Sequence, residues 1–68
     1  MIIEMTGLYG LSEKVKGYFK KHGASEYDFV GKKSHATVLS KEEADKIIAN
    51  KDYYLTQYKA KSIRVIEW

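Results

Sequence analysis

The chain of 68 residues contains no cysteine and no proline, and only one of its 12 basic residues, Arg64, is an arginine. Without cysteine it can form neither a disulfide nor a thiolate zinc site. Arginine is the usual residue for bidentate contacts to bases and phosphates, so the lysine bias argues against sequence-specific DNA recognition.

Long apolar segments are also lacking. The longest apolar run is far shorter than the about 20 residues that a membrane-spanning helix needs. The opening residues, MIIEM, lack the basic segment and long apolar core of a signal peptide. We therefore expect a cytoplasmic protein that does not enter a membrane.

The composition is that of a folded domain. Hydrophobic residues make up 44% and aromatic residues 13% of the chain, and the formal net charge is +3. This length corresponds to one domain, residues 1–68, with a small core, because such a chain buries only about 60% of its unfolded surface. The mild positive charge permits an acidic protein partner or a nucleic acid without requiring either.

The first half of the chain predicts a strand followed by a helix. Residues 1–7 have apolar side chains on both faces of an extended segment and end at Gly7. Residues 11–23 then carry apolar or amphipathic side chains at helical spacing, which are Leu11, Val15, Tyr18, Phe19 and His22. Ser12 is a suitable N-cap, Gly23 a suitable C-terminal cap, and Gly17 is a costly residue inside such a helix.

The second half predicts a hairpin, a helix and further strands. Residues 27–30 and 34–39 are rich in β-branched and aromatic residues on either side of Gly31. Ser40 followed by Glu43 forms a capping box, which predicts a helix that begins there and ends at residues 50–52. Residues 52–58 and 62–68 alternate like strands.

These elements follow the order β-α-β-β-α-β, with a further strand where the last segment divides. Helices with a single apolar stripe need a shared sheet face to cover it. We therefore predict an α+β fold: a mainly antiparallel sheet of four or five strands with both helices on one face, in a split βαβ, ferredoxin-like arrangement.

Catalytic and metal-binding patterns are weak. In the stretch SHATVLSKEEADKII, Ser34 and His35 face opposite sides of an extended strand, and its acidic residues are explained by the start of a helix. The two histidines, His22 and His35, show no metal-ligand spacing. We expect no enzymatic activity, no metal and no cofactor.

Two glycines precede the first predicted helix. Gly7, Gly10 and Ser12 would place free backbone N–H groups at a helix N-terminus, where anions bind. The stretch matches neither a dinucleotide-binding nor a Walker A pattern. A plain strand-to-helix turn is the alternative.

The aromatic residues are the most informative feature. Six tyrosines exceed what a core of this size can hide, so some are expected on an open sheet face beside lysines. The candidate partner-binding residues are Tyr53, Tyr54, Tyr58, Lys59, Lys61, Arg64 and Trp68. Tyr and Trp dominate binding hot spots, and they also stack on single-stranded nucleic acid.

The leading hypothesis is a small non-catalytic domain that binds a larger protein through this face, as accessory or phage-encoded modulators do. Weak nucleic-acid binding without sequence specificity is the alternative, and a homodimer is compatible with both. Half-buried aromatics that only pair across strands remain the structural explanation.

Overall fold

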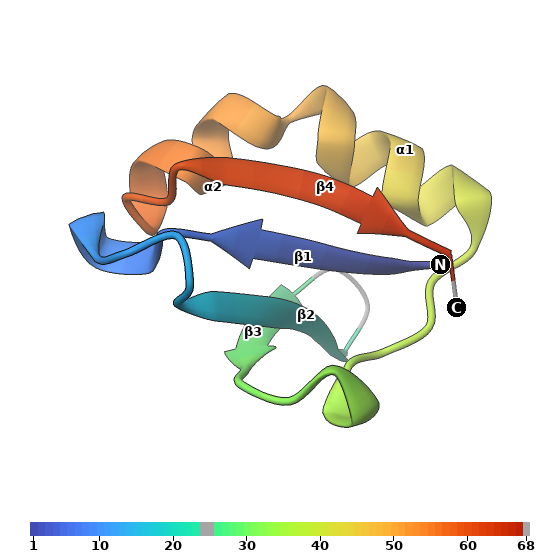
Figure 1. Cartoon of the computed structure of the whole chain (residues 1–68). Helices are drawn as coiled ribbons and strands as arrows, with labels where there is room; N and C mark the ends of the chain where they lie inside the picture. Colours follow the sequence, from blue (N-terminus) through green and yellow to red (C-terminus); the bar gives the residue numbers. More distant parts are fainter. Residues whose placement is uncertain (24–25, 68) are drawn as a thin grey trace.

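The computed structural model describes residues 1–23 and 26–67. It has an α+β fold with a single four-stranded antiparallel sheet, in the order β3-β2-β1-β4, and two helices (Figure 1). The strands are β1 (Ile2–Thr6), β2 (Lys16–His22), β3 (Glu26–Val30) and β4 (Ser62–Ile66), and the helices are α1 (Lys41–Ala49) and α2 (Lys51–Gln57). The predicted class is confirmed, but the predicted order is wrong, because the observed order is β-β-β-α-α-β.

The helix predicted over residues 11–23 is strand β2 instead. Gly17, Phe19 and Lys21 alternate with residues on the opposite face, and β2 pairs with both β1 and β3. Gly17, unfavourable in a helix, is useful here, since a Cβ at this position would lie 2.7 Å from Leu8 Cδ1. The adjacent residues Tyr18 and Phe19 are both buried, which fits one stripe of a helix as well as the two faces of a strand. Hydrophobic periodicity alone therefore predicted a helix where a strand forms.

The strand predicted over residues 52–58 is helix α2. The apolar stripe of α1, which includes Ile47 and Ile48, continues at seven-residue steps to Tyr54 and Leu55. Tyr54 and Tyr58 are four residues apart and both pack against the core. Asn50 interrupts the helix for a single residue, and the chain then resumes the same helical stripe.

The predicted hairpin is half correct. Residues 27–30 lie in β3, but their partner is β2 and not residues 34–39. Residues 33–35 form a 3-10 turn, and the extended segment after it donates from Thr37 N to Phe19 O at 3.1 Å and from Leu39 N to Met1 O at 2.6 Å. This segment therefore bridges β1 and β2 where the two strands diverge.

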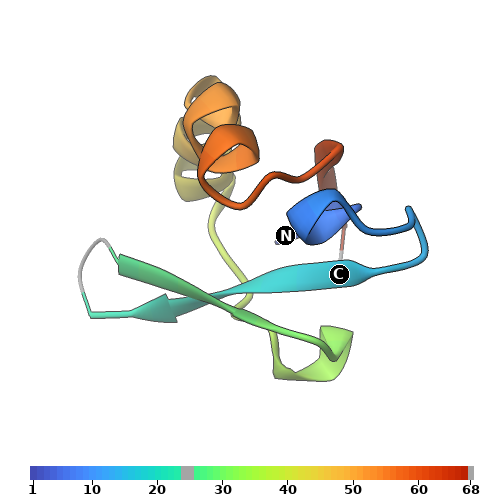
Figure 2. The same cartoon turned by 90° about the vertical axis from the view of Figure 1, so that its left-hand side faces the viewer.

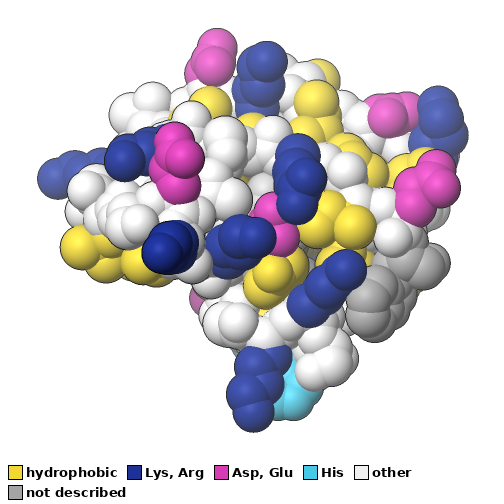
Figure 3. Space-filling model, viewed as in Figure 1, with side chains coloured by type: hydrophobic (Ala, Val, Ile, Leu, Met, Phe, Trp, Pro, Cys, Tyr) yellow, Lys and Arg dark blue, Asp and Glu magenta, His cyan; other side chains and the backbone are white. Residues whose placement is uncertain are grey.

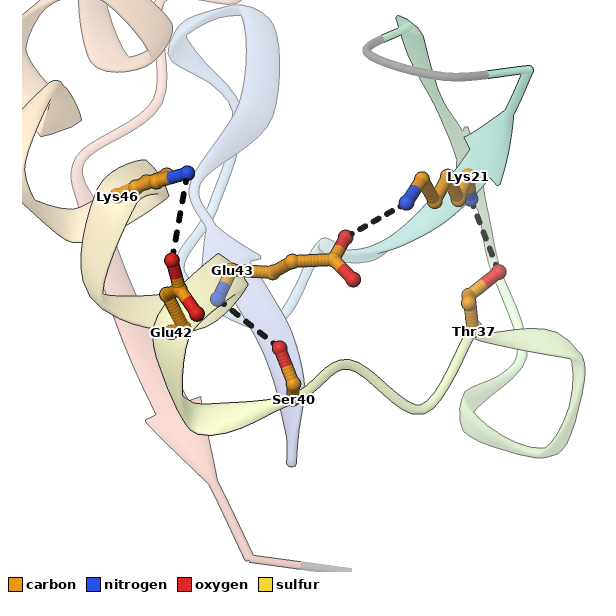
Figure 4. Close-up of polar contacts among 6 residues, drawn as sticks. All are labelled: Lys21, Thr37, Ser40, Glu42, Glu43 and Lys46. Atoms are coloured by element: carbon orange, nitrogen blue, oxygen red, sulfur yellow. Dashed lines mark hydrogen bonds and ion pairs between the residues drawn. The ribbon is translucent and has the colours of Figure 1, made fainter.

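The start of α1 is confirmed. Ser40 Oγ accepts a hydrogen bond from Glu43 N at 3.1 Å, as the capping pattern predicts. The Glu43 carboxylate points across to the sheet, where it accepts a hydrogen bond from Lys21 Nζ at 2.8 Å, and Lys21 N donates to Thr37 Oγ1 at 2.9 Å (Figure 4). The bond to Glu43 raises the pKa of Lys21. The stretch around Ser40 thus fastens the helix layer to β2.

Both helices cover the same face of the sheet, but only α1 is one of the two helices predicted for that face, because residues 16–22 form β2 and α2 was predicted as a strand. Figure 2 shows them nearly end-on in one layer, with the β2–β3 hairpin crossing beneath. The core between the layers is formed by seven buried residues: Ile3, Met5, Leu8, Phe19, Leu39, Ala44 and Ile47. The opposite face of the sheet, which we call the open face, is covered by neither α1 nor α2 (Figure 2).

Candidate functional site

The predicted partner-binding residues do not share one surface. Tyr53 and Tyr54 lie on α2 and Tyr58 caps its C-terminal end, all outside the sheet. Arg64 lies on β4 and contacts Glu4 of β1. Trp68 lies outside the described residues. The predicted aromatic sheet face is therefore wrong, although the three tyrosines do line a common cleft.

The two lysines of the set lie in the turn between α2 and β4. Lys59 is exposed and adopts a left-handed conformation with φ of 49°. The aliphatic part of Lys61 packs over Gly7, where a Cβ would lie 2.6 Å from Lys61 Cγ. These contacts give both lysines a role in closing the fold.

The predicted anion-binding loop loses its physical basis. Ser12 is not followed by a helix, because residues 11–15 form a loop that leads into β2. Gly7 N donates to Val15 O at 2.9 Å and Gly10 N to Lys59 O at 3.1 Å. The amides that would hold an anion therefore stabilise the loop itself.

A cleft between α2 and β3 brings together four of the six tyrosines. It has a volume of about 310 Å³ and is lined by Glu26, Tyr27, Tyr53, Tyr54, Gln57 and Tyr58. The residues on α2 fall into two pairs spaced four apart, 53 with 57 and 54 with 58, which places them on one side of the helix. We call this site the tyrosine cleft.

The rings of the tyrosine cleft are held by the aromatic core beneath them. Tyr54 meets Phe19 edge-on, with ring centroids 5.2 Å apart, and Tyr58 meets Phe29 in the same way at 4.1 Å. Tyr27 also contacts Phe19, at 5.6 Å. Such pairs stabilise by about 0.5–1.5 kcal/mol beyond burial, so three walls of the cleft are fixed before anything binds.

Tyr53 completes the cleft from the solvent side. Its ring stands at 78° to that of Tyr54, with centroids 5.2 Å apart, and the residue is 63% exposed. Burial, with smaller contributions from neighbouring hydroxyls, raises the pKa of Tyr54; burial, the hydroxyls and the Asp28 carboxylate raise that of Tyr58. The hydroxyl groups therefore stay protonated at neutral pH and can both donate and accept hydrogen bonds.

The open face uses its polar groups internally. Glu4, only 3% exposed, lies opposite Tyr18 on β2 and Arg64 on β4. Arg64 Nε donates to Glu4 Oε1 at 2.8 Å, and the Tyr18 side chain also hydrogen-bonds Glu4. Burial raises the pKa of Glu4, but these two bonds, together with the positive charges of Arg64 and Lys16, outweigh burial, and the net pKa is lowered.

The surface around this row is polar. Figure 3, seen from the side where β4 and β1 lie in front of the helices, shows Lys and Arg side chains spread over the face with acidic and apolar side chains between them. Among the described strand residues of this face, the aromatic residue is Tyr18, and it is only 8% exposed. The open face therefore offers charge but no exposed tyrosine on which a base could stack.

A second depression, of about 530 Å³, lies along α1 and is lined by Lys41, Glu42, Asp45, Lys46 and Ala49. Its charges pair along the helix, Lys41 Nζ with Asp45 Oδ2 at 3.2 Å and Lys46 Nζ with Glu42 Oε1 at 3.7 Å. Exposed pairs at this spacing are a common feature of helix surfaces. The depression is therefore the solvated side of α1, with its charges paired along the helix.

Ser34 and His35, the two residues considered above as a possible nucleophile and base, are exposed. Ser34 and His35 lie in the 3-10 turn before α1. Within residues 1–23 and 26–67, no group of three or more His, Cys, Asp or Glu side chains could hold a metal ion. Over the same residues, each helix is too short or too polar to cross a membrane.

Comparisons with protein-family models, with curated proteins and with solved structures found no match. Three residues of the tyrosine cleft, Glu26, Tyr27 and Gln57, were not among the predicted site residues. The continued helical stripe from Ile47 to Tyr54 is the sequence pattern that places α2, and with it Gln57, beside the tyrosines.

Proposed function

We propose that this chain is a small non-catalytic protein-interaction domain that binds a larger protein through the tyrosine cleft. The observation that carries the proposal is a cleft in which Tyr27, Tyr54 and Tyr58 are braced by core rings while Tyr53 remains exposed. Rigid aromatic side chains at the edge of a pocket are the usual anchors of protein interfaces. The accessory role and the cytoplasmic location expected from the sequence remain part of this proposal.

The open face supports a second candidate, weak binding of single-stranded nucleic acid. Its Lys and Arg side chains favour contact with phosphates (Figure 3). Tyr18, the aromatic residue among the described strand residues of this face, is buried and so is not free for the base stacking that such binding normally uses. The tyrosine cleft is therefore the better supported site, and a titration with a labelled single strand at low salt tests the alternative.

Tyr53→Ala tests the proposed site without disturbing the core. Tyr53 is 63% exposed, whereas Tyr54 and Tyr58 pack against Phe19 and Phe29, so alanine at either would also loosen the fold. Val38→Ala is the matched control, because Val38 is a 57% exposed apolar residue between the 3-10 turn and α1. The bound proteins should be identified by quantitative mass spectrometry after affinity capture from the source cells.

We expect one protein to be retained by the wild type and by Val38→Ala and to be lost with Tyr53→Ala. Retention of the same proteins by all three chains would contradict the proposal. Sedimentation of the purified chain tests whether the cleft is instead occupied by a second copy of the same chain. Self-association that Tyr53→Ala abolishes would show a homodimer instead of a larger partner.

A further inference from the structure

We propose that the tyrosine cleft receives an arginine side chain of the partner protein, held between Tyr53 and Tyr54 with Glu26 as its counter-ion. The inference rests on the proposed function and specifies its ligand. It is carried by the charge, the ring geometry and the size of the cleft.

The charge of the cleft is opposite to that of the chain. The protein carries 12 basic and 9 acidic residues, yet the described residues that line the cleft include Glu26 and no lysine or arginine. Within the described part of the chain Glu26 makes no ion pair, whereas the Asp28 carboxylate on the same strand has a close polar neighbour, with its Oδ2 2.8 Å from His22 Nε2. An unpaired carboxylate beside an aromatic cleft favours a cation.

The rings provide the second requirement of a cation site. Tyr53 and Tyr54 form a corner, because their planes stand at 78° to each other with centroids 5.2 Å apart. A cation near the face of a tyrosine ring is attracted by its quadrupole, and a corner brings two rings within reach. Tyr54 is fixed from beneath by Phe19, so part of the corner is preorganised.

Arginine suits the cleft better than lysine. A guanidinium group is planar, stacks on aromatic rings and carries five N–H donors. The Glu26 carboxylate, the Gln57 carbonyl and the tyrosine hydroxyl oxygens are acceptors around the same space. A volume of about 310 Å³ is large enough for one such side chain.

The arginine should come from a different protein. A second copy of this chain offers one arginine, Arg64, and its Nε already donates to the buried Glu4 carboxylate at 2.8 Å. If Arg64 left this contact to enter the cleft of another copy, the buried Glu4 carboxylate would lose its main charged partner. A buried charge without a partner is strongly destabilising. The occupant is therefore an exposed arginine on a partner surface.

The test compares an acetylated, amidated Gly-Arg-Gly tripeptide with the same peptide containing citrulline, which has nearly the same shape and no charge. Ligand-observed NMR with the full chain gives both dissociation constants, with peptide up to about 20 mM, because a single side chain binds in the millimolar range. Three variants locate the site: Tyr53→Ala, Glu26→Gln and the control Glu13→Gln, which makes the same charge change at an exposed loop residue.

We expect the arginine peptide to bind at least about fivefold more tightly than the citrulline peptide, as a partly desolvated cation on aromatic rings should. Tyr53→Ala and Glu26→Gln should each weaken it severalfold, and Glu13→Gln should not. Equal binding of the two peptides, or no binding of the arginine peptide, would overturn the arginine assignment. The capture experiment with Tyr53→Ala would still decide the proposed function separately.

Discussion

The two sides of this molecule use the same residue types in opposite ways. On the open face, Tyr18 is 8% exposed and Glu4 is 3% exposed, and the Glu4 carboxylate is hydrogen-bonded to both Tyr18 and Arg64. At the tyrosine cleft, Tyr53 is 63% exposed and the Glu26 carboxylate makes no ion pair among the described residues. Tyrosine and glutamate therefore occur both where their polar groups are satisfied within the fold and where those groups stay available to a partner.

Phe19→Ala should destabilise the protein most, because this ring lies in the core and supports the tyrosine cleft from beneath. Phe19 is 1% exposed and contacts the rings of Tyr27, Phe29 and Tyr54. Removing a buried phenylalanine costs about 3–5 kcal/mol, a large part of the roughly 3–10 kcal/mol expected of a domain this small. Circular dichroism should show a largely unfolded variant, and a folded one with native stability would disprove this packing.

Gly17→Ala should have the next largest effect. The added Cβ would lie 2.7 Å from Leu8 Cδ1 and 3.7 Å from the Phe29 ring, so Leu8 must move. Overpacking of this kind typically costs about 1–3 kcal/mol. Gly31→Ala is the matched control, since nothing lies within 4 Å of its added Cβ. Equal urea midpoints for the two variants would contradict the close contact between Leu8 and β2.

Glu4→Gln should lower the free energy of unfolding by about 1–2 kcal/mol at neutral pH, because it weakens the charged hydrogen bond to the partly exposed Arg64. The folded-state pKa of Glu4 is lowered from its ordinary 4.5, so its contribution is fully present above that pH and is lost as the pH falls through the folded-state value. Urea unfolding at several pH values should show wild type and variant converging in acid. A constant difference between them would contradict the role given to the Glu4 carboxylate.

Tyr53→Ala should have the smallest effect on stability. Its side chain is mostly exposed and contacts Tyr54 at the cleft edge, so the free energy of unfolding should change by less than about 0.5 kcal/mol. Urea unfolding measures this directly. A loss as large as that of Glu4→Gln would show that Tyr53 is a structural residue like Tyr18, and the contrast between the two sides would fail.

Local capping and alternation predicted part of the fold correctly. The N-cap of α1 forms as local sequence indicates, with Glu43 N donating a hydrogen bond to Ser40 Oγ. The first strand and the strand at residues 62–66 also lie within the segments predicted for them. Such features depend on residues within a few positions of one another. The antiparallel sheet and the placement of α1 on one of its faces followed from the need to bury an apolar stripe, whereas the second helix was predicted in the wrong part of the chain.

The errors arose where two periods fit the same residues. Tyr18 and Phe19 are both buried, on opposite faces of β2, which imitates one side of a helix. The alternation of Tyr54 with Tyr58 imitates a strand, although their four-residue spacing also suits a helix. Pairing of β2 with β1 and β3 decided the first case, and packing of α2 on the core decided the second. The tyrosine cleft could not be foreseen, because it requires β3 and α2 to be neighbours.

The most direct test of the division between the two sides is a two-dimensional amide NMR spectrum of the chain titrated with the Gly-Arg-Gly peptide. The account predicts shifts at residues 26–27 and 53–58, with the amides of Glu4, Tyr18 and Arg64 unmoved. Shifts centred on those three residues, with the α2 amides unmoved, would assign recognition to the open face and contradict the account.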